Sequence, residues 1–169
     1  MDILIVDGYN IIGAWPELKE MKDTDLEGAR DLLIDKMAEY QAYTGYQVII
    51  VFDAYLVPGI QKVFNRHDVT VIFTSEGETA DEKIEQLTVE LKGVLTQIHV
   101  ATSDYAEQKA IFGQGALRKS ARELLNEVKR IEKGIEEKIE EIDRSVRKSK
   151  IWLSPEVQAA FEKWRRGKS

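Results

Sequence analysis

The chain has 169 residues and a net charge of −6, and its hydrophobic content of 43% and charged content of 32% are typical of one soluble globular domain. The absence of cysteine excludes disulfides, thiolate zinc sites and cysteine nucleophiles. No apolar run approaches the roughly 20 residues that cross a bilayer, and the start, Met1-Asp2-Ile3, has no basic region. We therefore expect a cytoplasmic protein with no signal peptide and no membrane partner.

The charge is unevenly distributed along the chain. Residues 114–169 hold 15 Lys and Arg against 10 Asp and Glu, so the other 113 residues hold 9 against 20. An acidic body of charge −11 therefore precedes a basic tail of charge +5. This split favours a nucleic-acid or cation partner, although segregation of charge on helix surfaces gives the same pattern.

The first predicted element is a strand over residues 3–6, because four consecutive aliphatic residues are typical of a strand buried on both faces of a parallel sheet. Residues 11–16 are predicted to form a loop. A helix is predicted over residues 26–43, with Asp25 as its N-cap and Gly45 just beyond its end.

Three further buried strands are predicted over residues 48–52, 69–73 and 97–101, with a loop over 54–61. Thr79 and Glu82 have capping-box spacing and open a helix to about residue 92, and Ser103 opens a short helix through residue 111. Alternating strands and helices predict an α/β fold with a mainly parallel sheet of about four strands. Right-handed crossovers then place the carboxyl ends of the strands at one edge.

After Gly113-Gln114-Gly115 the apolar spacing predicts a long amphipathic helix over residues 117–146. Ser154-Pro155 is an N-cap and N1 pair for a final helix that ends near residue 166. We therefore divide the chain into a domain of residues 1–125 and a helical, basic extension of residues 126–169, which packs on that domain or projects from it.

Aspartates follow three of the four predicted strands, at Asp7, Asp53 and Asp104, and Asp81 lies in the first turn of a helix that starts at the same edge. Taken singly, each acid can be explained as a helix or turn cap. Their convergence on one edge favours a functional site. Clustered carboxylates repel one another, and oxygen ligands without His or Cys favour Mg²⁺ or Mn²⁺ as the ion that relieves the repulsion. The residues suit metal-assisted hydrolysis of a phosphodiester.

Five segments together resemble the YacP-type NYN-domain proteins in order and spacing, over residues 1 to about 125. They are Asp7-Gly8-Tyr9-Asn10, Val51-Phe52-Asp53-Ala54-Tyr55, Glu78-Thr79-Ala80-Asp81, Ala101-Thr102-Ser103-Asp104 with Glu107-Gln108, and Gly115-Ala116-Leu117-Arg118-Lys119-Ser120-Ala121-Arg122-Glu123.

The resemblance implies a PIN-like three-layer α/β/α fold and a metal-dependent endoribonuclease that cuts mRNA in the ribosomal A site. It implies that Asp7, Asp81 and Asp104 are catalytic metal ligands and that Asn10 and Asp53 support them. The expected cofactor is Mg²⁺ or Mn²⁺. The expected partners are mRNA and the ribosome, and we expect a monomer.

An acidic site does not attract a polyanion, so positive charge has to come from elsewhere in the chain. Arg118, Lys119 and Arg122, with Ser120 between them, are predicted to hold RNA phosphates. Tyr9, beside the first aspartate, is predicted to stack on a base.

Two other functions remain open. A HAD-like phosphatase or receiver-type phosphoacceptor also uses an Asp after the first strand, but the former needs a second Asp where Tyr9 stands, and no Lys follows a strand here. A non-catalytic RNA- or ribosome-binding module with a relict site would bind RNA through Arg118 and Arg122 without turnover.

Overall fold

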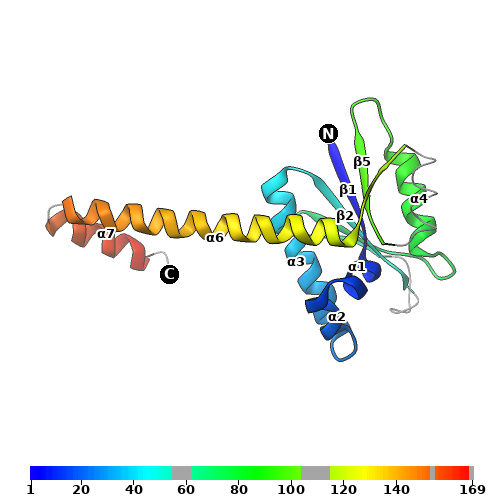
Figure 1. The fold of residues 1–169 in the computed structure, drawn as a ribbon, viewed down its shortest axis with the longest axis horizontal. Helices are drawn as coiled ribbons and strands as arrows, with labels where there is room; N and C mark the ends of the chain where they lie inside the picture. Colours follow the sequence, from blue (N-terminus) through cyan, green and yellow to red (C-terminus); the bar gives the residue numbers. More distant parts are fainter. Residues whose placement is uncertain (55–61, 104–114, 153–154, 168–169) are drawn as a thin grey trace. The chain divides into compact units, whose positions relative to one another are not determined.

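The computed structural model describes residues 1–54, 62–103, 115–152 and 155–167, and the chain forms two compact units, Met1–Lys129 and Arg130–Ser169. Their helices and strands are, in chain order, β1 (Asp2–Asp7), α1 (Gly8–Ala14), α2 (Pro16–Lys22), α3 (Leu26–Thr44), β2 (Gln47–Phe52), β3 (Lys62–Arg66), β4 (Val69–Phe73), α4 (Ala80–Leu91), β5 (Gln97–Ala101), β6 (Leu117–Lys119), α6 (Ala121–Trp152) and α7 (Pro155–Gly167) (Figure 1). None of the helices described is long and apolar enough to cross a membrane.

The described strands form one sheet in the order β3-β4-β2-β1-β5-β6. All neighbours are parallel except the β3–β4 pair. The register pairs Asp7 with Val51 and Val6 with Ala101, so β1, β2 and β5 end at nearly the same level. The predicted parallel sheet with its carboxyl ends at one edge is therefore confirmed.

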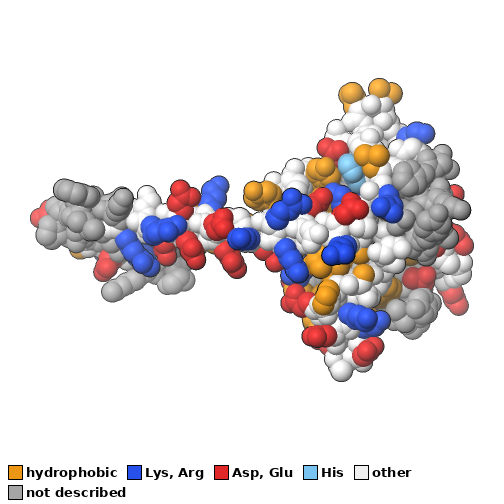
Figure 2. Space-filling view, viewed as in Figure 1, with side chains coloured by type: hydrophobic (Ala, Val, Ile, Leu, Met, Phe, Trp, Pro, Cys, Tyr) orange, Lys and Arg blue, Asp and Glu red, His pale blue; other side chains and the backbone are white. Residues whose placement is uncertain are grey.

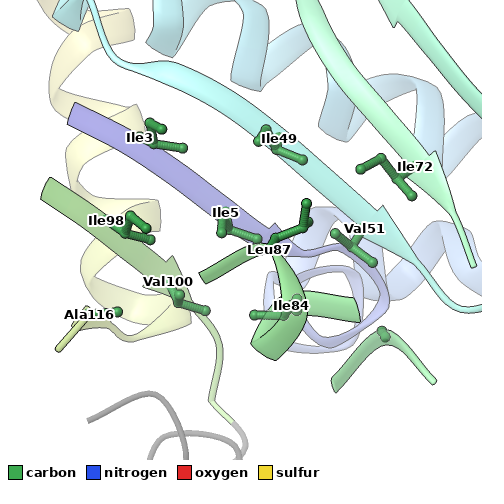
Figure 3. Packing of buried hydrophobic residues seen from close by; sticks show 11 residues of the cluster. Ile3, Ile5, Ile49, Val51, Ile72, Ile84, Leu87, Ile98, Val100 and Ala116 are labelled. Atoms are coloured by element: carbon green, nitrogen blue, oxygen red, sulfur yellow. The ribbon is translucent and has the colours of Figure 1, made fainter. Parts of the chain in front are cut away.

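Alternation along the strands divides the core between the two faces of the sheet. Ile3, Ile5 and Val51 point toward Ile84 and Leu87 of α4 in a buried cluster (Figure 3). The intervening residues of the same strands are buried on the opposite face, where α1 and α3 lie. The predicted three-layer α/β/α architecture is confirmed.

The predicted caps of two helices are present. The Asp25 carboxylate accepts the Gly28 N–H at 2.9 Å at the start of α3, and Gly45 ends this helix at φ 79°, a left-handed conformation that glycine adopts readily. Thr79 Oγ1 accepts the Glu82 N–H at 3.1 Å at the start of α4.

The two edge strands, β3 and β6, were not predicted. Residues 117–119, predicted as the first turn of the long helix, instead pair with β5, and α6 begins at Ala121. The Ser120 hydroxyl accepts the Glu123 N–H at 3.1 Å and fixes this start. The helix continues beyond the predicted end at residue 146 to Trp152, because no Gly or Pro interrupts it there.

The loop predicted over residues 11–16 is wrong, since α1 and α2 occupy this region. Pro16 is the first residue of α2, where its missing N–H costs nothing. Trp15 between the two helices is buried, and its Nε1–H donates to the Ala121 carbonyl at 2.8 Å. The segment predicted as a loop is therefore the junction of two short helices.

Gly8 allows the first turn of α1 to lie against the ring of Phe52. A Cβ on Gly8 would collide with this ring, which is fully buried and has no room to move. We expect Gly8→Ala to lower the free energy of unfolding by about 1–3 kcal/mol, the usual cost of overpacking a core. Gly13→Ala in the same helix is the control, because its Cβ would meet nothing within 4 Å. Urea unfolding of both variants tests this, and equal stability would contradict it.

Candidate active site

Asp7 is the last residue of β1 and the N-cap of α1, and its side chain lies at the carboxyl edge of the sheet. The residue is only 7% exposed. The hydroxyl of Thr102, directly after β5, donates to Asp7 Oδ2 at 3.2 Å. A buried carboxylate is stable only when such donors replace the water it has lost.

Strand alternation explains why these two residues meet. Asp7 continues the series of Ile3 and Ile5, and Thr102 continues that of Ile98 and Val100, all of which face α4. The parallel β1–β5 pairing then brings the ends of the two series side by side.

Asp53 follows β2 in the same way and makes contact with the start of α4. Its Oδ2 accepts the backbone N–H of Ala80 at 3.4 Å. Asp81 is the next residue and is exposed in the first turn of the helix. Asp53 therefore holds the backbone beside Asp81 at the edge of the sheet where Asp7 lies.

Asn10 makes the equivalent contact on the other side of Asp7. Its Oδ1 accepts the Ser103 N–H at 2.8 Å. Ser103 Oγ in turn accepts the Ala121 N–H at 3.4 Å, at the start of α6. The segment after β5 is thereby joined to α1 and α6 up to the residue that precedes Asp104.

Several predicted features lie outside the described residues. They are Asp104, the helix predicted through residue 111 and most of the loop over 54–61. Within the described ranges, no group of three or more His, Cys, Asp or Glu side chains is placed to hold a metal ion. Of the predicted ligand set, the structure places Asp7 and Asp81, so the metal site stays a prediction.

The residues predicted to hold RNA differ from one another in exposure and in ion pairing. Lys119 is 12% exposed in its side chain, and its Nζ lies 2.7 Å and 2.9 Å from the two carboxylate oxygens of Glu127. The Tyr40 hydroxyl donates to the same carboxylate at 2.9 Å, and burial together with Glu127 raises the pKa of this hydroxyl. The Lys119 charge is thus already paired inside the first unit.

Arg118 and Arg122 are exposed, and Arg118 Nη2 lies 3.9 Å from Glu123 Oε1. Ser120 caps α6. Along α6 itself, Figure 2 shows acidic and basic side chains interleaved. Arg118 and Arg122 are therefore the members of the predicted set with exposed cationic side chains.

Tyr9 is half-buried beside Asp7. Its ring centroid lies 5.0 Å from that of Phe52, and its hydroxyl accepts an N–H from Arg30 at 3.2 Å. The predicted stacking residue therefore packs partly against the body of the protein.

Two buried threonines of the site were not assigned a role from the sequence. Thr102 holds Asp7, and Thr74, after β4, accepts the Ala54 N–H at 2.9 Å through its hydroxyl. Thr102 continues the buried series of Ile98 and Val100, and Thr74 follows buried Ile72 in the same alternation. A polar residue in such a position is the signal that would have identified them.

A sequence model of the YacP-like NYN domain matches residues 4–166 of this chain. The chain is 64% identical to YacP of Bacillus subtilis (strain 168) over 167 residues, which cover 99% of this chain and 98% of that protein.

Two solved structures are also similar. The crystal structure of Rae1 (YacP) from Bacillus subtilis matches with a TM-score of 0.77 and 63% identity, over 99% of this chain and 97% of that one. The structure of its W164L mutant matches with a TM-score of 0.77 and 62% identity, over 85% of each chain.

The Thr102 hydroxyl is expected to stabilise the protein through Asp7. Thr102→Val keeps the shape of the side chain and removes the donor, which we expect to lower the free energy of unfolding by about 1–3 kcal/mol. Thr88→Val is the matched control, because the hydroxyl of this equally buried residue donates to Ile84 of its own helix, and we expect a change within about 0.5 kcal/mol. Urea titration of both variants measures these changes, and equal losses of stability would contradict the assignment.

Proposed function

Because the chain belongs to the YacP-like NYN domain family, we propose that it is a metal-dependent endoribonuclease that hydrolyses RNA phosphodiester bonds at the edge of the sheet where Asp7 lies. Family membership and the PIN-like fold indicate a nuclease-type hydrolase. Metal dependence, the RNA substrate and its location are the parts that we propose.

The observation that carries the proposal is the support given to Asp7 itself and to the backbone of the residues that precede Asp81 and Asp104. Thr102 donates to Asp7, Asp53 binds the backbone next to Asp81, and Asn10 binds the backbone next to Asp104. Three separate contacts thus fix Asp7 and the residues that directly precede Asp81 and Asp104. Such support is what preorganised charge in an active site requires.

The donor set fits Mg²⁺ or Mn²⁺, because Asp7, Asp81 and Asp104 offer only hard oxygen atoms. Asp7 and Asp81 alone fall short of three acids, so Asp104 is needed to complete the set. When bound, the ion would neutralise charge on the phosphodiester and activate water. The chain itself would orient Asp7 through Thr102 and fix the start of α4 through Asp53.

We further propose that the substrate is mRNA in the ribosomal A site and that the protein acts in the cytoplasm. The first 113 residues carry a charge of −11, so the body has little long-range attraction for free RNA. Arg118 and Arg122 provide exposed positive charge in the first unit. A large partner that presents the RNA would supply the remaining affinity and the choice of position.

The sequence alternatives give different results in the experiments below. The PIN-like fold supports a nuclease over a HAD-like or receiver-type phosphotransfer protein. A relict binding module would bind RNA but show no turnover that depends on Asp7.

Asp7→Asn and Asp81→Asn are expected to lower RNA cleavage at least about 100-fold, above the 10- to 100-fold loss typical of removing a group that only supports a metal ligand. The melting temperature should change little, because asparagine has the same shape. Asp23→Asn, at an exposed position beyond α2, is the control and should cleave normally.

Removal of divalent ions with EDTA should abolish cleavage by the wild type, and added Mg²⁺ or Mn²⁺ should restore it. Cleavage that survives both substitutions, or that is indifferent to EDTA, would disprove the proposed mechanism.

Cleavage mapping on translating ribosomes tests the location. We expect the wild type to cut mRNA at defined positions and faster than it cuts the same RNA free in solution, because the ribosome raises the effective concentration of the substrate. Equal rates and identical positions on free and ribosome-bound RNA would show that the ribosome contributes nothing.

A further inference from the structure

We propose that a row of four aromatic rings on the α3 side of the sheet ends in a stacking surface, the exposed ring of Phe64, for bases of the single-stranded RNA substrate. We call them the aromatic row, and its members, from the site outward, are Tyr9, Phe52, Phe73 and Phe64. This inference rests on the proposed nuclease function and adds a substrate subsite to it.

The rings follow one another at stacking distances. The centroids of Tyr9 and Phe52 are 5.0 Å apart. Phe52 and Phe73 stack at 5.3 Å with an angle of 26° between their planes, and Phe73 and Phe64 at 6.1 Å with 21°. The row therefore runs without a break from the residue two positions after Asp7 to the edge strand β3.

The register of the sheet produces this arrangement. Phe52 pairs with Phe73 across β2 and β4, and Phe64 pairs with Val71, two residues before Phe73. Alternation places all three rings on the face opposite α4. The row is thus built from neighbouring strands and has a fixed direction relative to Asp7.

Exposure is greatest at the outer end of the row, and from Phe52 outward it increases toward the edge of the sheet. Phe52 is fully buried, Tyr9 and Phe73 are half-buried, and Phe64 is 40% exposed. The row thus reaches the surface at its outer end, on the edge strand β3. The exposed end of the row offers a flat apolar surface on which a base can stack.

Arg30 on α3 adds positive charge to the row. Its Nη1 donates to the Tyr9 hydroxyl at 3.2 Å, and its guanidinium carbon lies 5.9 Å from the centre of the Phe73 ring. A guanidinium has five N–H donors, so the bond to Tyr9 leaves others that suit phosphate oxygens. Rings for the bases and a cation for the backbone are the two components of single-strand recognition.

The net charge of the first 113 residues favours stacking over ionic contacts as the mode of RNA binding. The first 113 residues have a net charge of −11, which opposes a phosphate-only mode of RNA binding. Stacking is non-ionic and tolerates any base, because every base has a flat face. Continuity with Asp7 favours the substrate RNA over a protein as the occupant.

Direct binding tests the row, with Val63 as the matched control. Val63 is the neighbour of Phe64 on β3, is more exposed at 61%, and lies on the opposite face, paired with Ile72. In an Asp7→Asn background that does not cleave, a labelled single-stranded RNA of mixed sequence would be titrated by fluorescence anisotropy. We expect Phe64→Ala to weaken binding about 5- to 150-fold, the range found for loss of one base stack, and Val63→Ala less than about twofold.

The salt dependence of RNA binding separates the contribution of stacking from that of charge. The loss caused by Phe64→Ala should be the same at low and high salt, whereas the loss caused by Arg30→Gln should shrink as salt rises. Phe64→Trp gives a second readout that does not depend on stability, because bases that stack on the new indole should quench its fluorescence. Val63→Trp should show no such quenching.

The outcomes distinguish this inference from the proposed function. If the wild type cleaves RNA through Asp7, but Phe64→Ala and Val63→Ala bind and cleave alike on free and ribosome-bound RNA, the aromatic row is not a substrate subsite. If Phe64→Trp is quenched by a protein partner and not by RNA, the row is a protein interface and the inference is overturned. If the wild type neither binds nor cleaves RNA in either form, the proposed function and the inference both fail.

Discussion

The hydrogen bond from Thr102 to Asp7 is the interaction on which the rest of the site depends. It satisfies a carboxylate that is almost fully buried at the end of a central strand, where the loss of hydration would otherwise be costly. It also joins β1 to the end of β5, which are 95 residues apart in the sequence. The Thr102 N–H meanwhile donates to the Lys119 carbonyl of β6 at 3.0 Å. One residue therefore connects the first strand, the fifth and the sixth.

Two further contacts join separate elements around the same edge, where the Asp53 side chain binds the Ala80 N–H and the Asn10 side chain binds the Ser103 N–H. These two contacts fix the backbone directly before Asp81 and Asp104. Phe52, Phe73 and Phe64 of the aromatic row lie on the other face of the sheet. Alternation thus separates Asp7 and Asp53, which continue the α4-facing series, from these three rings, which belong to the α3-facing series.

Much of this could be predicted from the sequence, because runs of buried aliphatic residues identify β1, β2, β4 and β5, and an acid lies at or shortly after the end of three of them. The edge strands could not, since Lys62–Arg66 and Leu117–Lys119 are short, mix polar and apolar residues, and become strands only by pairing with a neighbour. Lys119 was predicted to bind phosphate. Its pairing with Glu127 could not be predicted, because Glu127 lies on a different element. The role of Thr102 follows from three-dimensional neighbours that spacing does not reveal.

The indole of Trp15 determines where the protein can be shortened. A fragment that stopped before Ala121 would remove the carbonyl that accepts the Trp15 N–H and leave a buried donor unsatisfied, at a cost of about 1–3 kcal/mol. A longer fragment that stopped at residue 125 would keep this carbonyl but would lack Glu127 and the buried Val128. The opening turns of the long helix are therefore part of the first compact unit, and the smallest fragment that folds by itself has to retain them.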